Sequence, residues 1–211
     1  MITIFAYQQV PPMVQGLVRD LRVRWALKEA GLEYRTQLLG PGENKQPPYR
    51  ALQPFGQVPA YREDELVMFE SGAIVLHIGA KSTALLPAQP AARARATCWL
   101  LAALNTLEPV VQQLTEIDLF FPQAPWANER RALIEQRLRM RLAELAAALG
   151  ARAYFEERFT AGDLMIATVL RFLRHTTLVT QDPVLGPYLA RCEARPAFQE
   201  AHAEQLAAFA A

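Results

Sequence analysis

The sequence has little cysteine and little histidine. Its 211 residues include 2 cysteines, Cys98 and Cys192, and 3 histidines. Two widely separated cysteines are too few for a disulfide framework, so we expect two reduced, buried thiols. No cluster of cysteine and histidine has the spacing of a metal site. The sequence therefore predicts a protein that holds no metal.

An excess of charge and long apolar runs are also missing. The formal net charge of +1 gives no strong attraction for nucleic acid or anionic membranes. No stretch reaches the roughly 18 uninterrupted apolar residues of a membrane helix, and the first residues lack the pattern of a signal peptide. The apolar content of 52% excludes a disordered chain. We expect a folded, cytoplasmic protein that binds neither nucleic acid nor membrane.

The composition changes near the middle of the chain. Of the 10 glycines, 7 occur up to Leu86, whereas 27 of the 35 alanines occur from Pro87 onward. Glycine is frequent at turns, and alanine is the best helix former. We therefore expect a mixed α/β domain over residues 1–84, a proline-containing linker over 85–90, and an all-helical domain over 91–211.

Apolar periodicity predicts the elements of both domains. In the first domain the expected order is βαβαββα, with strands at 2–6, 32–38, 58–61 and 66–69 and helices at 17–30, 49–52 and 71–80. In the second domain, helices are expected at 93–118, 128–149, 160–173, 187–193 and 196–208. Pro109 can bend the first of these. Thr160 and Asp163 have the spacing of a capping box, and the apolar run that follows predicts a central helix.

Two short motifs have chemical potential. Pro59 opens a predicted strand, and a cis bond before it would turn the Val58 backbone outward to pair with an extended peptide; an ordinary trans proline is the alternative. Ser71 begins a predicted helix, whose N-terminus favours a carboxylate, and Glu70 can hold an ammonium group. This pair suits the head group of an α-amino acid. Simple N-capping by Ser71 is the alternative.

Several motifs occur together in a familiar order: Gly56-Gln57-Val58-Pro59, then Glu70-Ser71, the linker prolines, and Phe159-Thr160-Ala161-Gly162-Asp163, with Ala26–Leu32 before them. With these motifs the chain resembles the cytosolic glutathione transferases, of bacterial type, along essentially its whole length. The resemblance implies a thioredoxin-like domain followed by an all-helical domain, and a homodimer that acts in detoxification. It implies that the thiolate of bound glutathione attacks a hydrophobic electrophile, or that glutathione serves a related reduction, isomerisation or dehalogenation. A non-catalytic binding or regulatory protein of the same fold is the alternative.

The resemblance also implies roles for individual residues. Val58 would pair with the cysteinyl unit of glutathione, Pro59 would be cis, Glu70 and Ser71 would hold the γ-glutamyl end, and Gln57 would add a polar contact. Further implied contacts are Lys45 or Gln46 with the glycyl carboxylate, and Asn105 or Glu108 of a partner subunit with the γ-glutamyl amine.

The group that activates the thiol is harder to assign. This family usually places a Tyr, Ser or Cys near the sulfur, but there is no Ser, Thr, Cys or Tyr between Gln8 and Arg24. Three alternatives are left: the Tyr7 hydroxyl, the charge of Arg19, or backbone N–H groups of the 10–16 loop. For the electrophile, apolar side chains are candidates: Pro12, Met13, Phe120, Phe121 and Trp126. Packing at helix ends is an equal alternative for the two phenylalanines.

Overall fold

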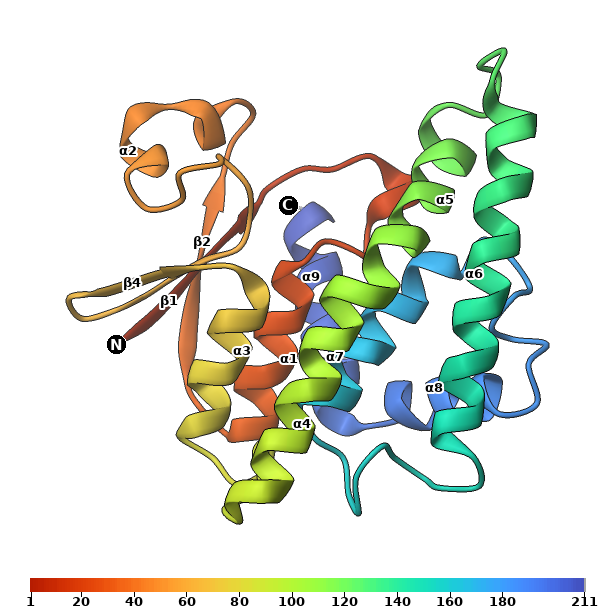
Figure 1. The fold of residues 1–211 in the computed structure, drawn as a ribbon. Helices are drawn as coiled ribbons and strands as arrows, with labels where there is room; N and C mark the ends of the chain where they lie inside the picture. Colours follow the sequence, from red (N-terminus) through yellow and green to blue (C-terminus); the bar gives the residue numbers. More distant parts are fainter. Residues whose placement is uncertain (211) are drawn as a thin grey trace. The chain divides into compact units, whose positions relative to one another are not determined.

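The computed structural model describes residues 1–210. Contacts within the chain divide it into two units (Figure 1). The first unit combines Met1–Leu86 with the C-terminal segment from Arg195, and the second is Pro87–Ala194. The division after Leu86 lies inside the expected linker. The last helix, however, belongs by its contacts to the first unit rather than to the helical one.

The first unit is built on a four-stranded mixed sheet. Its strands are β1 (Ile2–Tyr7), β2 (Tyr34–Leu39), β3 (Ala60–Glu63) and β4 (Leu66–Phe69), in the spatial order β2-β1-β3-β4. Strand β1 is parallel to β2 and antiparallel to β3, and β3 and β4 form an antiparallel hairpin. This is the predicted α/β topology. Strand β3 begins after Pro59, which has no N–H to give to the ladder.

The helices of the first unit are α1 (Asp20–Ala30), α2 (Pro47–Arg50), α3 (Ser71–Ala80) and α9 (Pro196–Ala210), with short 3-10 turns at Pro12–Val14 and Glu43–Lys45. Helices α1 and α3 lie side by side (Figure 1). Helix α1 starts three residues later than predicted, because Leu21 N–H bonds to Val18 C=O in a tight turn. Its end at Gly31, with φ +65°, is as expected.

The two faces of the sheet have different partners. Phe5 packs with Tyr49 of α2, with Val58 and with Tyr7 in one apolar cluster. On the other face, the ring of Tyr61 lies 5.6 Å from the ring of His77 in α3. The end of β1 is therefore on the face of the sheet that packs against α2, close to Val58.

Polar contacts join α9 to α1. Arg195 donates two hydrogen bonds to the Glu29 carboxylate, at 2.6 and 2.7 Å. The Gln205 side-chain amide donates to Asp20 at 2.6 Å, and Arg24 donates to the same carboxylate at 2.8 Å. Complete burial raises the pKa of Asp20, although these two hydrogen bonds oppose the shift. Helix α9 thus covers charged groups of α1 that would otherwise need water.

The second unit is helical, as predicted. It contains α4 (Pro90–Ala102), a π-helical turn at Ala103–Leu107, α5 (Glu108–Phe120), α6 (Ala127–Leu149), α7 (Ala161–Leu170), a 3-10 turn at Arg171–Leu173, and α8 (Leu185–Glu193). The helix expected over 93–118 is therefore α4 and α5, joined by the π turn. Pro109 is the second residue of α5, and its missing N–H removes a helical hydrogen bond back to the π turn.

Helix α7 is the core of this unit, and all ten of its residues are buried. The predicted capping box is present: Asp163 accepts from the N–H of Thr160 at 2.9 Å. The same carboxylate accepts from Phe155 N–H at 3.0 Å and from the Tyr188 hydroxyl at 3.1 Å. A Cβ at Gly162 would lie 2.6 Å from Trp99 Cβ, so glycine is needed where α4 approaches α7. These contacts fix the start of the helix in place.

Within residues 1–210, none of the helices combines the length and the apolar character that crossing a membrane requires. Within residues 1–210 the two cysteines form no disulfide; Cys192 is buried, whereas Cys98 is exposed, contrary to the expected burial.

Candidate functional site

The Val58–Pro59 peptide bond is cis, as the resemblance implied. The chain enters it through Gly56, which has φ +64°, a backbone region that favours glycine. A Cβ at this position would also lie 2.7 Å from the Asn44 carbonyl oxygen. Glycine is thus required twice over in the Gly56-Gln57-Val58-Pro59 motif.

Side chains of Gln53 and Tyr49 hold the backbone of the segment before Val58 in place by hydrogen bonds. The Gln53 side-chain oxygen accepts from the N–H groups of Phe55 and Gln57, at 2.7 and 3.2 Å. The Tyr49 hydroxyl donates to the Gln57 carbonyl at 2.6 Å. By contrast, the N–H and C=O of Val58 bond to no other residue of the described chain. Both backbone groups of Val58 are therefore left for a ligand.

The Glu70-Ser71 motif lies where β4 passes into α3. Glu70 has φ +68° and ψ 110°, which is a strained conformation for a residue with a Cβ. Its carbonyl accepts from Ile74 N–H at 3.0 Å, so Glu70 is the N-cap residue of α3. The side chain of Glu70 is exposed. Ser71 is the first helical residue and is not the N-cap, which excludes simple capping by its hydroxyl. The Ser71 oxygen instead accepts from Arg22 Nη1 at 3.2 Å.

The strand registers bring these motifs to one edge of the sheet. Phe5 pairs with Ala60, and Ala60 pairs with Phe69. Tyr7 follows Phe5 by two residues, Val58 precedes Ala60 by two, and Glu70 follows Phe69. All three therefore leave the sheet at the same edge, and Tyr7 packs in the apolar cluster that contains Val58.

Tyr7 is the candidate thiol-activating group that the structure places at this edge. Its hydroxyl accepts a long hydrogen bond from Asn44 Nδ2 at 3.4 Å, and Asn44 also donates to the Gly56 carbonyl at 2.6 Å. Partial burial raises the pKa of Tyr7, although the bond from Asn44 acts against the shift. The phenol thus keeps its proton at neutral pH, and this proton is available to a ligand.

Asn44 was not identified from the sequence. It connects a predicted thiol-activating residue to the backbone of the cis-proline segment, yet its only local signal is a turn-forming residue after Gly40-Pro41-Gly42. Its two partners, Tyr7 and Gly56, are far from it in the chain, so periodicity could not reveal the contact.

Arg19 lies at the N-terminal end of α1 and is partly buried. A helix N-terminus favours negative charge, so this position is compatible with the second alternative for the thiol. The 10–16 loop, the third alternative, contains the 3-10 turn at Pro12–Val14. Leu17, at the end of this loop, is buried.

Other predicted binding residues lie on the surface. Gln57, Lys45 and Gln46 are exposed, and Lys45 and Gln46 directly precede α2. Asn105 is exposed in the π-helical turn, whereas Glu108 is 6% exposed. Burial makes Glu108 less suited than Asn105 to meet a ligand of another subunit.

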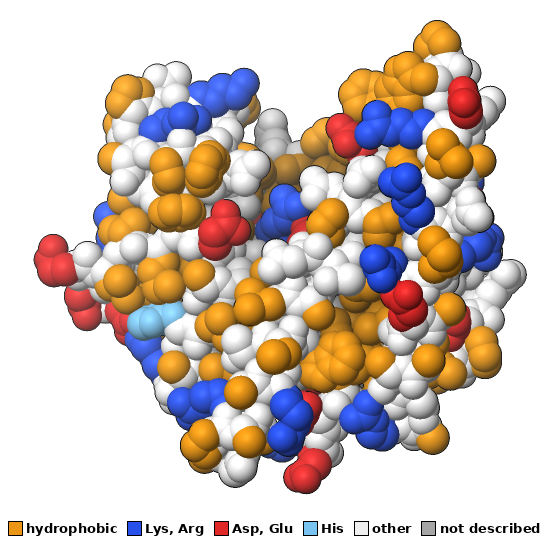
Figure 2. All heavy atoms as spheres, in the orientation of Figure 1, with side chains coloured by type: hydrophobic (Ala, Val, Ile, Leu, Met, Phe, Trp, Pro, Cys, Tyr) orange, Lys and Arg blue, Asp and Glu red, His pale blue; other side chains and the backbone are white. Residues whose placement is uncertain are grey.

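The predicted apolar contacts for the electrophile are all exposed. In the first unit, Pro12 and Met13 lie on the surface. In the second unit, Phe120, Phe121 and Trp126 are 50%, 46% and 43% exposed. The rings of Phe121 and Trp126 lie 5.8 Å apart. Hydrophobic side chains gather where α5 ends and α6 begins (Figure 2), and exposed apolar patches of this kind often mark binding sites.

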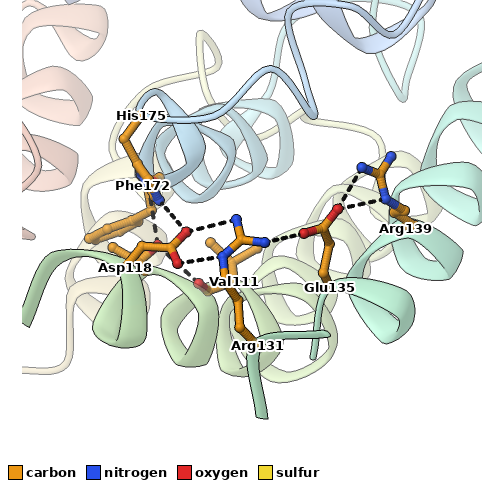
Figure 3. A network of polar contacts seen from close by, with 8 residues as sticks. Val111, Asp118, Arg131, Glu135, Arg139, Phe172 and His175 are labelled. Carbon is orange, nitrogen blue, oxygen red and sulfur yellow. Dashed lines mark hydrogen bonds and ion pairs between the residues drawn. The ribbon is translucent and has the colours of Figure 1, made fainter. Parts of the chain in front are cut away.

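A polar network follows α5 and α6 from this aromatic end (Figure 3). Arg131 donates to both oxygens of Asp118, at 2.7 and 3.2 Å, and also to Glu135. Arg139 donates to Glu135 at 2.9 Å, and this bond and the one from Arg131 lower the pKa of that carboxyl. His175 completes the network, with Nε2 3.0 Å from Asp118. Since these arginines pair with acids of the same unit, they do not form a free phosphate-binding track.

The described part of the chain contains no group of three or more His, Cys, Asp or Glu residues that could hold a metal ion. The candidate site contains a phenol, a serine hydroxyl, a carboxylate and backbone amides.

Comparison with known proteins identifies the family. Residues 13–80 match the model of the glutathione S-transferase N-terminal domain. A glutathione S-transferase of Hyoscyamus muticus is 29% identical over 193 residues, which cover 86% of this chain and 91% of the relative. A theta class glutathione S-transferase from Xanthomonas axonopodis pv. citri, solved with glutathione bound, is 30% identical with a TM-score of 0.79, over 95% of this chain and 96% of that one. The chain belongs to the glutathione S-transferase family.

A further member confirms the fold expected of this family. Glutathione transferase F7 from Populus trichocarpa superposes with a TM-score of 0.84 at 23% identity, over 98% of this chain and 99% of that one. The predicted family and the predicted thioredoxin-like domain with a helical second part are therefore correct.

Proposed function

We propose that this protein is a glutathione transferase: it binds glutathione, and the thiolate attacks an electrophilic carbon to give a thioether. The observation that carries this proposal is the pair of unused backbone groups on Val58, next to a cis proline and at the same sheet edge as Glu70. An extended peptide can pair with such a backbone as an additional strand would. The glutathione bound in the Xanthomonas relative supports this ligand.

Each part of glutathione has a candidate partner. The cysteinyl backbone pairs with Val58 after the cis Pro59, the γ-glutamyl ammonium meets Glu70, and the γ-glutamyl carboxylate meets Ser71 and the first N–H groups of α3. Gln57 adds a polar contact from its exposed position. We assign Lys45 to the glycyl carboxylate because it is an exposed cation two residues before the start of α2.

Tyr7 is our candidate for activating the thiol. Its protonated hydroxyl donates a hydrogen bond to the sulfur and so stabilises the thiolate. The thiol proton passes to solvent, the thiolate electron pair forms the new carbon–sulfur bond, and the leaving group departs with its own pair. Arg19 and the 10–16 backbone are the alternatives, and both would act by charge or dipole rather than through the phenol.

The electrophile is hydrophobic in this proposal. Each unit offers candidate contacts of its own: Pro12 and Met13 in the first unit, and the exposed rings of Phe120, Phe121 and Trp126 in the second. Apolar lining with few polar groups is typical of sites for hydrophobic small molecules.

We also propose a homodimer, with Asn105 reaching the γ-glutamyl amine of the partner subunit. The support is an exposed apolar group on the hairpin side of the first unit: Phe55, Leu66, Val67 and Phe69. The rings of Phe55 and Phe69 lie 6.1 Å apart in an edge-to-face arrangement. A role in detoxification in the cytoplasm is part of the same proposal. The expected bacterial type of the family is not supported, because the relatives include plant proteins.

A second candidate is a glutathione-binding protein without transferase turnover. It is favoured by the lack of Ser, Thr, Cys or Tyr between Gln8 and Arg24.

A glutathione-dependent reductase is a different candidate. The relatives also include a disulfide-bond oxidoreductase of Escherichia coli, 32% identical over 53% of this chain and 57% of that protein. A glutathione-dependent reduction would use the same thiolate.

Retention on immobilised glutathione, followed by turnover assays, tests these proposals. We expect elution by free glutathione and conjugation of 1-chloro-2,4-dinitrobenzene. Binding without conjugation, but with reduction of a peroxide or a disulfide, would favour the reductase. Binding without any turnover would favour the binding protein, and no retention would contradict the assigned site altogether.

A further inference from the structure

Strand β2 is an edge of the sheet, and only half of its backbone is used. Leu39 C=O accepts from Gln8 N–H on the β1 side. Because successive residues of a strand direct their backbone groups to opposite sides, the N–H and C=O groups of Tyr34, Thr36 and Leu38 point away from β1. No other residue of the described chain bonds to these outward groups. They are left for a strand of another molecule.

The β2 edge lacks the usual protection against such pairing. Proteins commonly block a free edge by shortening it or by placing proline or several charges on it. Strand β2 has six residues and no proline, and its one charged side chain, Arg35, donates to Thr3 of β1 at 2.9 Å. The apolar residues of the β3–β4 hairpin lie toward the other end of the sheet. The β2 edge is therefore separate from the proposed dimer surface.

A cavity adjoins β2 on each face of the sheet. Side chains alternate along a strand, so Tyr34, Thr36 and Leu38 point to one face, and Gln37 and Leu39 point to the other. The first three line a cavity of about 630 Å³ together with residues of α1 and α9, which we call the α9 cavity. The other two line a cavity of about 530 Å³ together with residues of α2, which we call the α2 cavity. A strand added to β2 would send alternate side chains toward the two cavities.

The α9 cavity has more acids than cations in its lining. Lys28 pairs with Glu204 at 2.5 Å, and Glu200 lies 3.8 Å from the same ammonium. Arg24, the other cation of the lining, pairs with a buried aspartate at 2.8 Å. Glu33 also lines the cavity and forms no ion pair with the described residues. This excess of negative charge is complementary to a lysine or arginine side chain.

The α2 cavity has a different character. Phe5, Leu39 and Tyr49 contribute apolar surface to its lining. Its two charged side chains, Arg62 and Glu43, have opposite signs, and the Arg62 guanidinium lies 5.5 Å from the centre of the Phe5 ring. A cavity without net charge and with aromatic walls suits an apolar side chain.

We propose that β2 binds an extended peptide segment of a partner protein as an additional strand. The backbone of the segment pairs with the outward groups of Thr36 and Leu38, and its alternate side chains provide the specificity. A basic side chain enters the α9 cavity, and its apolar neighbours enter the α2 cavity. The inference uses none of the residues assigned to glutathione, so it does not depend on the proposed function.

The first test uses a fluorescein-labelled peptide, Thr-Val-Lys-Phe-Lys-Val-Thr, and fluorescence anisotropy with the unaltered protein. We expect the affinity to fall by about 10-fold or more when both lysines are replaced by glutamate. Methylation of the peptide's amide nitrogens, which keeps every side chain, should abolish binding because it removes the backbone donors. If the lysine peptide does not bind, or binds no better than the methylated one, the inference is wrong.

Thr36→Pro tests the edge itself. Its missing N–H is one that points away from β1, so the β1–β2 ladder is kept while pairing with the peptide is blocked. We expect the affinity for the lysine peptide to fall by about 10-fold or more. Thr36→Val, which keeps the N–H and the branched shape, is the matched control and should bind the peptide as the unaltered protein does. Equal affinities of Thr36→Pro and Thr36→Val would overturn the inference.

The combined substitution Glu33→Gln and Glu200→Gln covers the case in which Thr36→Pro does not fold, because both side chains are exposed. It should remove most of the preference for lysine over glutamate peptides, and an unchanged preference would contradict the assigned charge. A second copy of this chain is the competing occupant. If the unaltered protein binds no peptide and forms an oligomer that Thr36→Pro dissociates in size-exclusion chromatography, the edge pairs with a second copy and the proposal fails. Retention on immobilised glutathione is scored separately, so its failure would contradict only the proposed function.

Discussion

At the residue scale, the decisive features are single groups with unusual surroundings. Tyr7 has a hydroxyl that accepts from Asn44 and keeps its own proton, because burial raises its pKa. Glu70 holds a positive φ that residues with a Cβ seldom adopt. Each can be tested by substitution of a single residue.

Tyr7→Phe removes the proposed hydrogen bond to sulfur. We expect the pKa of the bound glutathione thiol to rise by about 1 unit or more and kcat/KM to fall by about 10- to 100-fold. Ultraviolet absorbance of the thiolate against pH, with and without glutathione, measures the first effect. Tyr34→Phe, which changes a phenol of β2, is the control. If the thiol of bound glutathione has the same pKa in Tyr7→Phe as in this control, but a higher pKa in Arg19→Ala, Arg19 rather than Tyr7 activates the thiol.

Glu70→Gly separates backbone strain from ligand binding. Glycine accepts φ +68° without a Cβ penalty, so the free energy of unfolding should rise by about 1 kcal/mol. The affinity for glutathione should nevertheless fall, because the carboxylate that meets the ammonium is gone. Glu70→Gln, with a Cβ but no charge, should lose affinity without gaining stability. A Glu70→Gly variant that is both more stable and equally tight would show that Glu70 does not contact the ligand.

At the element scale, buried and half-buried carboxylates fix the ends of helices and strands. Asp163 accepts from two backbone N–H groups and the Tyr188 hydroxyl at the start of α7, and burial raises the pKa of this carboxyl. Glu63 of β3 accepts from Lys81, the residue that follows α3, and Nε2 of His77 in α3 lies 3.2 Å from the same carboxylate. One contact holds the central helix of the second unit, and the other holds a hairpin to α3.

Asp163→Ala should be among the most damaging single changes in the second unit. It leaves buried donors without acceptors, which we expect to cost about 3 kcal/mol or more of unfolding free energy. Asp182→Ala is the matched comparison, because Asp182 accepts from Val184 and Leu185 N–H near the start of α8. Its loss should cost only about 1 kcal/mol. Urea denaturation of both variants measures the difference, and equal losses would contradict the central role of the α7 cap.

The Glu63 contact predicts a pH dependence. Hydrogen bonds from Lys81 and then His77 lower the pKa of Glu63 from 4.5 to about 2. Since the folded-state pKa lies below that of the unfolded chain, the stabilisation is complete above pH 4.5 and is lost as the pH falls toward 2. Glu63→Gln should therefore cost about 1 kcal/mol at neutral pH and progressively less in acid. Glu65→Gln, in the same hairpin, is the control, and a difference that does not shrink in acid would exclude Glu63 as its source.

At the scale of the whole molecule, features that depend on neighbours in the chain can be predicted from the sequence, whereas contacts between distant residues cannot. The Gly31 helix end, the capping box at Thr160 and the hairpin each depend on residues close together in the chain, so the sequence could predict them. The place of α9 could not be predicted in this way, because Gln205 and Asp20 are 185 positions apart. The same holds for Arg22 with Ser71 in the site, where neither periodicity nor spacing marks the pair.

Removing α9 tests how far the first unit depends on it. A chain that ends at Ala194 should leave Asp20 without its bond from Gln205, and Glu29 without Arg195. We expect α1 to lose hydrogen-exchange protection and the melting temperature to fall by several degrees. Gln205→Ala should show a smaller loss confined to α1. Unchanged protection of α1 in the shortened chain would mean that α9 is dispensable.

The assignment of α9 to the first unit has a consequence for biosynthesis. A ribosome makes the sheet, α1 and α3 before Pro87–Ala194, and α9 only after that segment has emerged. Until then the surface of α1 that α9 covers, including Asp20 and Arg24, is exposed to water. N-terminal domains generally fold first during synthesis, but this α/β unit is still incomplete at that stage. The first unit can therefore be completed only after α9 has been translated.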